Sequence, residues 1–498
     1  MQIAESRETE PVTSKPQICA VVTGRTMDEM RAARDAVTGA GLVELRLDFA
    51  DRPDAAAALQ GRRLPVVVTC RAKWEGGNFD GSEDERRRIL ESALDLGAEF
   101  VDVEAAAGFA PSLIEKTRGR RIVISEHKFE APPGDVGVRF AALRSTGAEI
   151  AKLAVQVESL EQMSALFDVA DAAGPACDRI LIAMGNAGMT SRVFPARLGS
   201  RWTYAGDGVA PGQLTVERLH REFHFDRIDA DATLYSVVGK PIVHSRSPMM
   251  HNAGFAAAGK NAVYVPLEAR DAEDFVRFAR RSGLAGASIT TPFKVELMPY
   301  MDEIDPLARR VGAVNTLVVR NGRWIGANTD VEGFLAPLEA RMKLPGAKAV
   351  VLGSGGAARA VAVALLDRGA AVTICARRRE AAEAIVNDLG GRVGEWPLRE
   401  AGWDLLVNAT TAGSVVNSGD PADGAVLTGK IVYDLVYLPT ETELLRRARR
   451  EGCETIGGMD MLIAQAERQF ELWTGQRPPE GLFRSVSSGE ANNVRRIR

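Results

Sequence analysis

One lysine stands inside a segment that has the character of a buried β-strand, Ile150-Ala151-Lys152-Leu153-Ala154. An apolar environment disfavours the charged form of a lysine, lowers its pKa and leaves a neutral amine that can attack a ketone. The preceding predicted strand ends in Glu126-His127, and a histidine with an ordinary pKa of about 6.5 is suited to moving protons. The pattern predicts an imine on Lys152, while His127 removes a proton from the adjacent carbon and then protonates a leaving hydroxyl. That reaction is the β-elimination of water from a hydroxyketone.

A second interpretation of Lys152 requires no chemistry. Polar residues interrupt two other predicted strands at alternate positions, Glu44 and Arg46 in one and Asp102 and Glu104 in the other. This spacing places each pair on one face of its strand. The lysine could then be half of a buried ion pair with one of these three carboxylates, since lysine is almost never fully buried without a partner or a function. The histidine that closes the adjacent strand favours the catalytic interpretation.

A second group of polar motifs follows in the other half of the chain. It comprises His244-Ser245-Arg246-Ser247-Pro248, Thr290-Thr291-Pro292-Phe293-Lys294, Gly312-Ala313-Val314-Asn315-Thr316 and Asn328-Thr329-Asp330. Two serine hydroxyls beside a helix amino terminus can bind a carboxylate, although serine-rich loops more commonly form caps and turns. A lysine and an aspartate brought together could handle the proton of a hydroxyl whose carbon gains or loses a hydride. As an isolated pair they could equally form a surface salt bridge.

A glycine-rich turn provides the signal for a dinucleotide. The strand predicted at 347–352 runs directly into Gly353-Ser354-Gly355-Gly356-Ala357-Ala358 and then a helix, which is the G-x-G-x-x-A pattern in its expected context. The next strand ends in Ala376-Arg377-Arg378-Arg379, where an NAD enzyme would carry an acidic residue for the ribose. Arginines there favour NADP; a solvated basic turn is the alternative.

The elements that must position Lys152 and His127 have the sequence pattern of a barrel. Over residues 18–228, eight short apolar segments alternate with helical ones, at 18–23, 42–47, 65–71, 100–104, 121–127, 149–155, 179–184 and 202–205. Near-continuous apolar strands separated by helices imply parallel pairing, buried on both faces. The pattern predicts an α/β chain that begins with a (β/α)8 TIM barrel, whose chemistry belongs at the carboxyl ends of the strands.

The elements around the second group read as two further domains. We predict a substrate domain over 233–340, completed by a helix at 459–478, and a Rossmann NADP-binding domain over 345–457. Within the substrate domain, Asn321-Gly322 predicts a hairpin that delivers Asn328–Asp330 to a strand end. The polar segments 1–17 and 480–498 are expected to be disordered tails.

Composition and charge exclude several classes of protein. With 498 residues, 46% hydrophobic and 26% charged, the chain is expected to form several globular domains. A net charge of −4 gives no reason to expect nucleic acid or an anionic membrane as a partner. No apolar segment reaches the roughly 18 residues that a membrane span needs. Five scattered cysteines indicate reduced thiols in a cytoplasmic protein, with no metal site, and the polar first 17 residues do not resemble a targeting signal.

The first half resembles type I 3-dehydroquinate dehydratase from residue 18 to about 228. The strings that carry the resemblance are Glu44-Leu45-Arg46-Leu47-Asp48, Cys70-Arg71-Ala72-Lys73-Trp74-Glu75-Gly76-Gly77, Glu126-His127, Lys152, Met184-Gly185, Ser191-Arg192 and Ala210-Pro211-Gly212-Gln213. The resemblance implies that Lys152 forms a Schiff base, that His127 is the acid/base and that Glu75 orients it. It also implies a substrate-binding set of Glu44, Arg46, Arg71, Arg192 and Gln213, in which Arg192 is our choice for the substrate carboxylate.

Two positions depart from that family's pattern. Val209 stands where the family usually has serine, and Glu126 adds a carboxylate beside the predicted general base. The first change is expected to remove one substrate hydrogen bond, and neither change removes the core chemistry.

The second half resembles shikimate dehydrogenase from residue 233 to about 478. Further supporting strings are Asn408-Ala409-Thr410-Thr411-Ala412-Gly413, Tyr433-Asp434-Leu435-Val436-Tyr437 and Met461-Leu462-Ile463-Ala464-Gln465-Ala466. The resemblance implies that Lys294 and Asp330 are the catalytic pair. It implies a substrate-binding set of Ser245, Ser247, Thr290, Asn315, Asn328 and Gln465. It implies a cofactor-binding set of Gly353, Ser354, Gly355, Gly356, Ala357, Arg377, Arg378, Asn408 and Thr410. Ser288 and Ala376 each replace a usual asparagine.

Together the two halves predict a bifunctional enzyme of the shikimate pathway. It would dehydrate 3-dehydroquinate to 3-dehydroshikimate and then reduce this product to shikimate with NADPH. One alternative is a dehydratase fused to a quinate/shikimate dehydrogenase that uses NAD. Another is a ligand-sensing regulator built on inactive copies of these folds, which would be expected to have lost the catalytic lysines. The oligomeric state is left open.

Overall fold

The computed structural model describes residues 15–130, 134–174, 177–206, 208, 212–242 and 245–487. Val209 and His244 lie outside the described residues. The chain forms two compact units. The first comprises the chain up to Ser236 together with Lys240–Leu284, and the second comprises Val237–Gly239 and the chain from Ala285 onward. In the part of the chain that is described, no helix combines the length and apolar character needed to cross a membrane.

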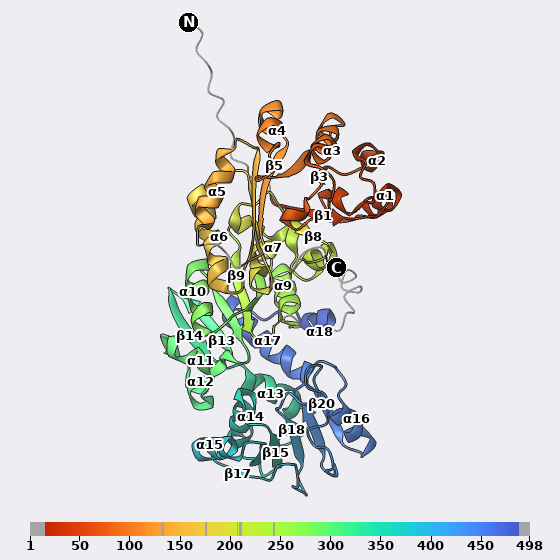
Figure 1. The fold of residues 1–498 in the computed structure, drawn as a ribbon. Coiled ribbons are helices and arrows are strands. Elements are labelled where there is room, and N and C mark those ends of the chain that lie inside the picture. Colours follow the sequence, from red (N-terminus) through yellow and green to blue (C-terminus); the bar gives the residue numbers. More distant parts are fainter. Residues whose placement is uncertain are drawn as a thin grey trace. The chain divides into compact units, whose positions relative to one another are not determined.

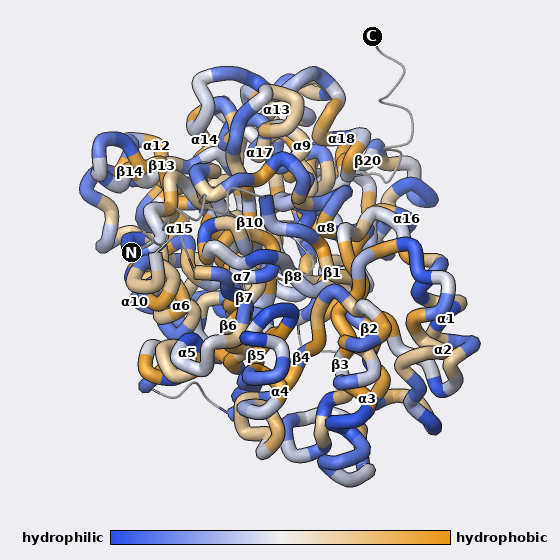
Figure 2. Tube along the Cα trace, turned by 90° about the horizontal axis from the view of Figure 1, so that it is seen from above, coloured by the Kyte–Doolittle hydropathy of each residue, from blue (hydrophilic) through white to orange (hydrophobic). Residues whose placement is uncertain are grey.

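The first unit contains an eight-stranded parallel barrel. Its strands are β1 (Gln17–Val22), β2 (Leu42–Arg46), β3 (Val66–Thr69), β4 (Phe100–Glu104), β5 (Ile122–Lys128), β6 (Ile150–Gln156), β7 (Arg179–Met184) and β8 (Trp202–Ala205). Each strand pairs in parallel with the next along the chain, and β8 pairs with β1. Between β7 and β8 the described residues form an isolated bridge of Arg179 to Ser200. The strand labels follow one another around a ring in Figure 2, and the predicted TIM barrel is confirmed.

Helices alternate with these strands as the sequence pattern predicts. They are α1 (Met27–Asp35), α2 (Ala55–Leu59), α3 (Glu83–Asp95), α4 (Ala110–Thr117), α5 (Val136–Ser145), α6 (Leu160–Ala173), α7 (Met189–Val193) and α8 (Val216–Arg221). Local sequence sets several of their starts. For example, α3 begins with a capping box in which Ser82 and Glu85 each accept the other's backbone N–H.

The first unit also includes the beginning of the predicted substrate domain. These elements are part of β9 (Thr233–Gly239), α9 (Ser247–Ala257), β10 (Ala262–Glu268) and α10 (Ala272–Ser282). Helix α10 packs against the barrel helix α6 (Figure 1), with the rings of Phe278 and Phe167 6.0 Å apart. Arg281 binds both Asp168 and Asp171 on α6, at 2.6 and 2.7 Å. Packing therefore joins this segment to the barrel.

A buried carboxylate on α10 completes the amino end of α6. Asp274 is 1% exposed and accepts the backbone N–H groups of Leu160 and Glu161, at 3.1 and 2.8 Å. Ser159 accepts the N–H of Gln162 at 3.3 Å. The first three N–H groups of α6, which have no partner within the helix, are therefore all satisfied by side chains.

The second unit contains a four-stranded part of the substrate-domain sheet. Its strands are β11 (Gly286–Ile289), β12 (Glu303–Ile304), β13 (Thr316–Arg320) and β14 (Arg323–Ala327), and its helices are α11 (Phe293–Glu296), α12 (Pro306–Val311) and α13 (Asp330–Glu339). β13 and β14 form the predicted hairpin, whose turn residues Asn321 and Gly322 have φ of 51° and 76°. Positive φ at both positions is what a two-residue hairpin turn requires.

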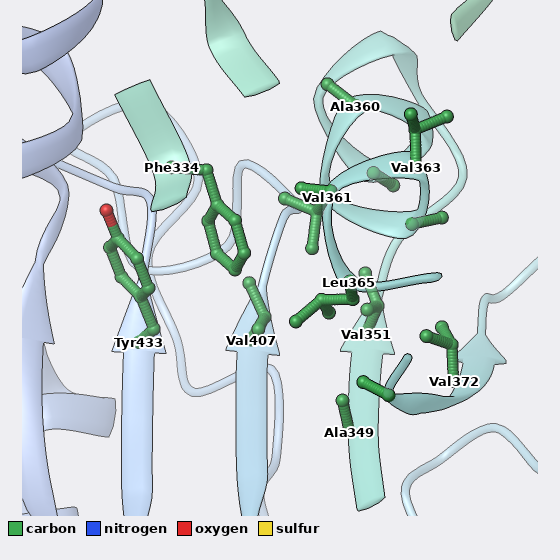
Figure 3. Packing of buried hydrophobic residues seen from close by; sticks show 14 of the residues in the cluster. Phe334, Ala349, Val351, Ala360, Val361, Val363, Leu365, Val372, Val407 and Tyr433 are labelled. Carbon is green, nitrogen blue, oxygen red and sulfur yellow. The ribbon is translucent and has the colours of Figure 1, made fainter. Parts of the chain in front are cut away.

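A Rossmann sheet follows in the same unit. Its elements are β15 (Lys348–Leu352), α14 (Gly356–Asp367), β16 (Ala371–Cys375), α15 (Arg379–Leu389), β17 (Arg392–Val393), β18 (Leu405–Asn408), β19 (Ile431–Asp434), α16 (Glu443–Arg450) and β20 (Glu454–Gly457). The strand order is β17-β16-β15-β18-β19-β20, all parallel, which is the doubly wound order of dinucleotide-binding domains. Figure 3 shows Val361 and Leu365 of α14 directed toward Val351 and Val407 of this sheet.

The carboxyl-terminal helices return to earlier parts of the second unit. α17 (Gly458–Thr474) packs along α13 so closely that a Cβ atom on Gly333 would lie 2.6 Å from the Cβ of Gln465. A short helix, α18 (Leu482–Ser487), lies within the segment that the sequence analysis assigned to the polar tail. Its Phe483 is fully buried and meets the ring of Phe470 edge-on at 5.9 Å, so one buried aromatic residue accounts for the order of this segment.

We expect Asp274→Ala to lower the stability of the full-length chain by about 1–3 kcal/mol, because buried backbone N–H groups lose their acceptor. Urea unfolding followed by circular dichroism measures the change. Glu273→Ala is the matched control, since the Glu273 side chain forms a surface ion pair with Arg277 and its loss should change stability by less than about 0.5 kcal/mol. Equal effects of the two substitutions would contradict the capping role.

Candidate active sites

A cavity of about 100 Å³ opens at the carboxyl ends of the barrel strands. The eight residues predicted for the dehydratase all line it: Lys152, His127, Glu75, Glu44, Arg46, Arg71, Arg192 and Gln213. Val21, Gly76, Phe129, Ala154, Ile182, Met184 and Tyr204 complete the wall. The parallel barrel explains the convergence, because the carboxyl ends of all its strands meet at one face.

Lys152 does not lie in the apolar environment that the sequence analysis expected. Its Nζ is 2.8 Å from Oδ2 of Asp102 and 4.0 Å from Oε1 of Glu44. On another side it lies 4.3 Å from the centre of the Tyr204 ring. The expectation was wrong because β2 and β4 direct their alternate polar residues into the same barrel interior. Lys152 is therefore both a buried ion-paired amine and a cavity-lining one, and the two interpretations of this residue are compatible.

Asp102 is the carboxylate that joins the cations of this site. Its Oδ1 is 2.9 Å from Nη2 of Arg71, while its Oδ2 faces Lys152. Burial alone would raise the pKa of Asp102, but Arg71 and Lys152 hold it well below its usual range. The carboxylate is therefore ionised at neutral pH and stabilises positive charge on the lysine nitrogen.

His127 is oriented by Glu75. Its Nδ1 lies 2.9 Å from Oε1 of Glu75, and its backbone N–H donates to the same oxygen. Burial lowers the pKa of His127 well below its usual value, and Arg71 and Lys152 lower it further. The assumption of an unperturbed histidine pKa was therefore wrong. Burial raises the pKa of Glu75 to about 7, partly opposed by Arg71. At neutral pH the imidazole is therefore uncharged.

The predicted substrate-binding residues line the same cavity but differ in how far their polar groups are already hydrogen-bonded within the protein. Arg46 makes two hydrogen bonds to Asp48, at 2.8 and 2.7 Å, so part of its guanidinium is already engaged. Arg192 is 2% exposed, and burial lowers its pKa to about 10, which leaves it charged at neutral pH. Oε1 of Gln213 is buried and has no hydrogen-bond partner among the described residues. A substrate that carries a carboxylate and hydroxyls matches this set of groups.

The predicted dehydrogenase pair meets in the second unit. Nζ of Lys294, on α11, lies 2.5 Å from Oδ2 of Asp330, the first residue of α13. The amide of Asn315 donates to the other oxygen of Asp330 at 2.8 Å, and its Oδ1 accepts the backbone N–H of Thr329. A lysine held on a buried carboxylate in this way can donate or accept the proton of a substrate hydroxyl.

One predicted substrate-binding residue, Asn328, also supports the loop that carries Asp330. Asn328 donates to the carbonyl of Ala313 and accepts the N–H of Asp330, so its amide stabilises the loop. Thr290 is half-buried directly after β11.

Ser245 and Ser247 lie at the amino end of α9 in the first unit, where the backbone N–H of Ser247 donates to the hydroxyl of Ser245 at 3.3 Å.

Gln469 is a residue of this site that sequence reasoning missed. It is 1% exposed on α17 and donates to the carbonyl of Asn315 and the hydroxyl of Thr316, at 3.1 and 3.0 Å. Its Oε1 accepts from the hydroxyl of Ser288 at 2.6 Å. A glutamine one helical turn after Gln465 was the available signal, because residues four apart share a helix face.

The glycine-rich turn has the geometry that a dinucleotide requires. Gly353 has φ of +119°, and a Cβ there would lie 2.9 Å from the carbonyl oxygen of Ala409, so only glycine fits. A Cβ on Gly355 would meet nothing within 4 Å, which leaves open space at the amino end of α14 for a pyrophosphate. A Cβ on Gly356 would lie 3.4 Å from Cδ of Lys294. The turn therefore borders the predicted catalytic lysine, and the residues present fit a dinucleotide.

The remaining predicted cofactor residues surround the ends of neighbouring strands. Arg377 and Arg378 are exposed directly after β16, where the adenosine ribose of a dinucleotide is bound in this fold. Asn408 is fully buried and donates to Asp434 at 2.8 Å. Thr410 donates to Asn408 at 2.7 Å. Asn408 and Thr410 thus shape the loop after β18.

Family models match most of the chain. The type I 3-dehydroquinase model matches residues 18–230. The shikimate dehydrogenase substrate-binding domain matches 237–317, and the shikimate 5'-dehydrogenase carboxyl-terminal domain matches 458–486.

Similar proteins of known function also match as a dehydratase half followed by a dehydrogenase half. The bifunctional 3-dehydroquinate dehydratase/shikimate dehydrogenase of Arabidopsis thaliana, a chloroplastic protein, is 33% identical over 95% of this chain and 84% of its own length. The NADP⁺ shikimate dehydrogenase of Gluconobacter oxydans is 43% identical over 50% of this chain and 93% of its own length. That of Moorella thermoacetica is 41% identical over 52% and 94%. With two separate sites on one polypeptide, the chain belongs to the family of bifunctional 3-dehydroquinate dehydratase/shikimate dehydrogenases.

Proposed function

We propose that this chain dehydrates 3-dehydroquinate to 3-dehydroshikimate in its barrel and reduces that product to shikimate with NADPH in its second half. The observation that carries the first assignment is the convergence of a buried lysine and a glutamate-held histidine on one cavity. The second assignment rests on the Lys294–Asp330 pair beside a glycine turn shaped for a dinucleotide. The cavity and the turn both lie where their folds place chemistry.

In the barrel, we assign Lys152 as the nucleophile. Its amine, once deprotonated, adds to the substrate ketone, and the ketone oxygen leaves as water to give an imine. The protonated imine keeps a positive charge on the lysine nitrogen, which the ionised Asp102 at 2.8 Å stabilises. That charge acidifies the adjacent carbon.

His127 and Glu75 then carry the proton. The neutral imidazole removes the proton from the acidified carbon, and the resulting imidazolium is stabilised by Glu75 at 2.9 Å. The same proton is returned to the hydroxyl that leaves from the next carbon as water. A second water hydrolyses the imine and releases the unsaturated ketone. Arg192 binds the substrate carboxylate, with Glu44, Arg46, Arg71 and Gln213 around the ring.

In the second half, Lys294 and Asp330 handle the hydroxyl proton. Bound NADPH supplies the hydride that reduces the ketone. Lys294 donates a proton to the ketone oxygen as it becomes a hydroxyl, and Asp330 with Asn315 keeps the lysine in place. Gly353–Ala357, Arg377, Arg378, Asn408 and Thr410 hold the cofactor, while Thr290, Asn328 and Gln465 hold the substrate.

The alternatives have less support. An inactive sensor is expected to lack the reacting groups, whereas Lys152, His127, Lys294 and Asp330 are all placed with partners. The exposed Arg377 and Arg378 favour NADP over NAD. Five free cysteines, all buried, suit the reducing cytoplasm that we propose as its location.

The two lysines separate the two reactions. In a coupled assay on 3-dehydroquinate and NADPH, we expect Lys152→Ala to form no unsaturated ketone, because no imine can form. Lys294→Ala should accumulate that ketone and slow its reduction by about 10²–10⁴-fold, the usual contribution of a general acid. Ultraviolet absorbance reports the ketone and NADPH oxidation reports its reduction. A borohydride-trapped adduct on wild type, absent in Lys152→Ala, tests the Schiff base; wild type that turns over without such an adduct would refute it.

The dehydratase should lose activity as pH falls through about 7. The folded pKa of Glu75 is raised to about 7, so below that pH the carboxyl is protonated and no longer stabilises the imidazolium. We expect kcat/KM for dehydration to rise with pH through this value. Glu75→Gln should abolish this step in the profile and lower the plateau by about 10²-fold. If the step near pH 7 persists in Glu75→Gln, another group titrates there.

The arginines after β16 should select the cofactor. We expect Arg377→Ala combined with Arg378→Ala to lower kcat/KM for NADPH by about tenfold or more, since a charged hydrogen bond contributes about 1.5–3 kcal/mol. The value for NADH should change little. Arg379→Ala is the matched control, because Arg379 binds Glu383 on its own helix at 2.9 Å. A parallel loss with both cofactors would indicate a structural effect.

A further inference from the structure

Arg86, on α3, has no exposed surface although it does not line the dehydratase cavity. Its Nη1 forms an ion pair with Oε2 of Glu104, which is also fully buried. Its Nη2 binds Glu83, one turn earlier on the same helix, at 2.6 Å. A buried guanidinium is costly unless it is paired, and Glu104 is its fully buried partner.

Glu104 connects this arginine to the reacting groups. Its other oxygen, Oε1, is 3.3 Å from Nη1 of Arg71. The same Nη1 is 3.7 Å from Oε1 of Glu75, the oxygen that binds Nδ1 of His127. A continuous path of charged contacts therefore runs from Arg86 to the general base.

Arg86 also contacts the segment that carries Arg71 and Glu75. It donates to the carbonyl oxygen of Cys70 at 3.4 Å, and its guanidinium lies 5.5 Å from the centre of the Trp74 ring. Cys70 and Trp74 immediately precede Arg71 and Glu75 in the chain. Oε1 of Glu104 accepts the backbone N–H of Ala72 at 3.3 Å. The Arg86–Glu104 pair thus fixes the backbone of this segment at Cys70 and Ala72 and also binds the guanidinium of Arg71.

We propose that Arg86 is a positioning residue of the dehydratase, which acts through Glu104 and Arg71 on the protonation of the Glu75–His127 pair. This inference rests on the dehydratase function proposed above. With Arg86 present, Glu104 is shared between two guanidinium groups and leaves Arg71 available to Glu75. Without Arg86, the negative charge of Glu104 would be neutralised by Arg71 alone, and the Glu75–His127 pair would experience more of it.

The direction of the effect follows from the groups that face the pair. Glu75 faces Arg71 and His127, with the charges of Glu104 and Asp102 nearby. His127 faces Arg71, Lys152, Asp102 and Arg46. Loss of a buried positive charge makes it harder to ionise Glu75 and easier to protonate His127. In the pH profile of kcat/KM for dehydration, both changes move the acidic limb, where activity rises with pH, to higher pH.

Four variants of the full-length chain test the proposal through the pH dependence of kcat/KM for dehydration. Arg86→Met should move the acidic limb upward, by less than the roughly 1–3 pH units that a charge in direct contact produces, because Arg86 acts through Glu104 and Arg71. Arg86→Lys keeps the charge and should leave the limb near the wild-type position. Glu104→Gln should move it downward, and this variant tests the path even if Arg86→Met does not fold. The double variant Arg86→Met/Glu104→Gln should return the limb toward wild type.

Two controls separate positioning from damage to the fold. Arg87→Met removes the neighbouring arginine, which is exposed and binds Glu91, and should not move the limb. The reductase activity of the same chain should be unchanged in all variants. The proposal is overturned if Arg86→Met and Arg86→Lys lower kcat/KM equally at every pH, or if the effects of Arg86→Met and Glu104→Gln do not cancel. A wild-type chain that forms no unsaturated ketone would instead refute the proposed function.

Discussion

The need to pair every buried charge governs the barrel interior. An unpaired ion in a protein interior costs several kcal/mol, so a buried amine is stable only beside a carboxylate. Lys152 has Asp102, and Asp102 also binds Arg71. Arg71 in turn shares Glu104 with Arg86. The reacting lysine is thus one member of a connected set, and the position of each member depends on the others. The polar residues that interrupt the barrel strands supply this set.

The sequence predicts the barrel well because its signals are local. Apolar segments separated by helical ones mark every strand, and Lys152 and His127 stand out because polar residues are rare in such segments. Charge partners depend instead on how strands align. Lys152 is in register with Ser125 of β5, and Asp102 with Val123, a relation that no spacing along the chain reveals. Arg86 is one of three consecutive arginines; only its position four residues before the buried Leu90 indicates that it faces inward.

The second unit stabilises its lysine–carboxylate pair with amides. Around Lys294 and Asp330 the buried partners are Asn315, Asn328 and Gln469, each of which donates and accepts at once. An amide can satisfy a carboxylate oxygen and a backbone group without adding charge. The amides therefore add no net charge to the Lys294–Asp330 pair. The family resemblance implies that Asn315 and Asn328 bind substrate; in the structure their hydrogen bonds support the loops around the pair.

The boundary of the barrel depends on which physical criterion defines it. Sequence resemblance ends the dehydratase near residue 230, since the motifs of the reaction end there. Buried contacts extend the same compact unit to Leu284. Part of the reason lies in α6, where Ser159 of the barrel accepts one of the first backbone N–H groups. Asp274 accepts two more from the following domain. Since α6 follows directly on the strand that carries Lys152, a contact made by the dehydrogenase half helps to fix the element beside the dehydratase nucleophile.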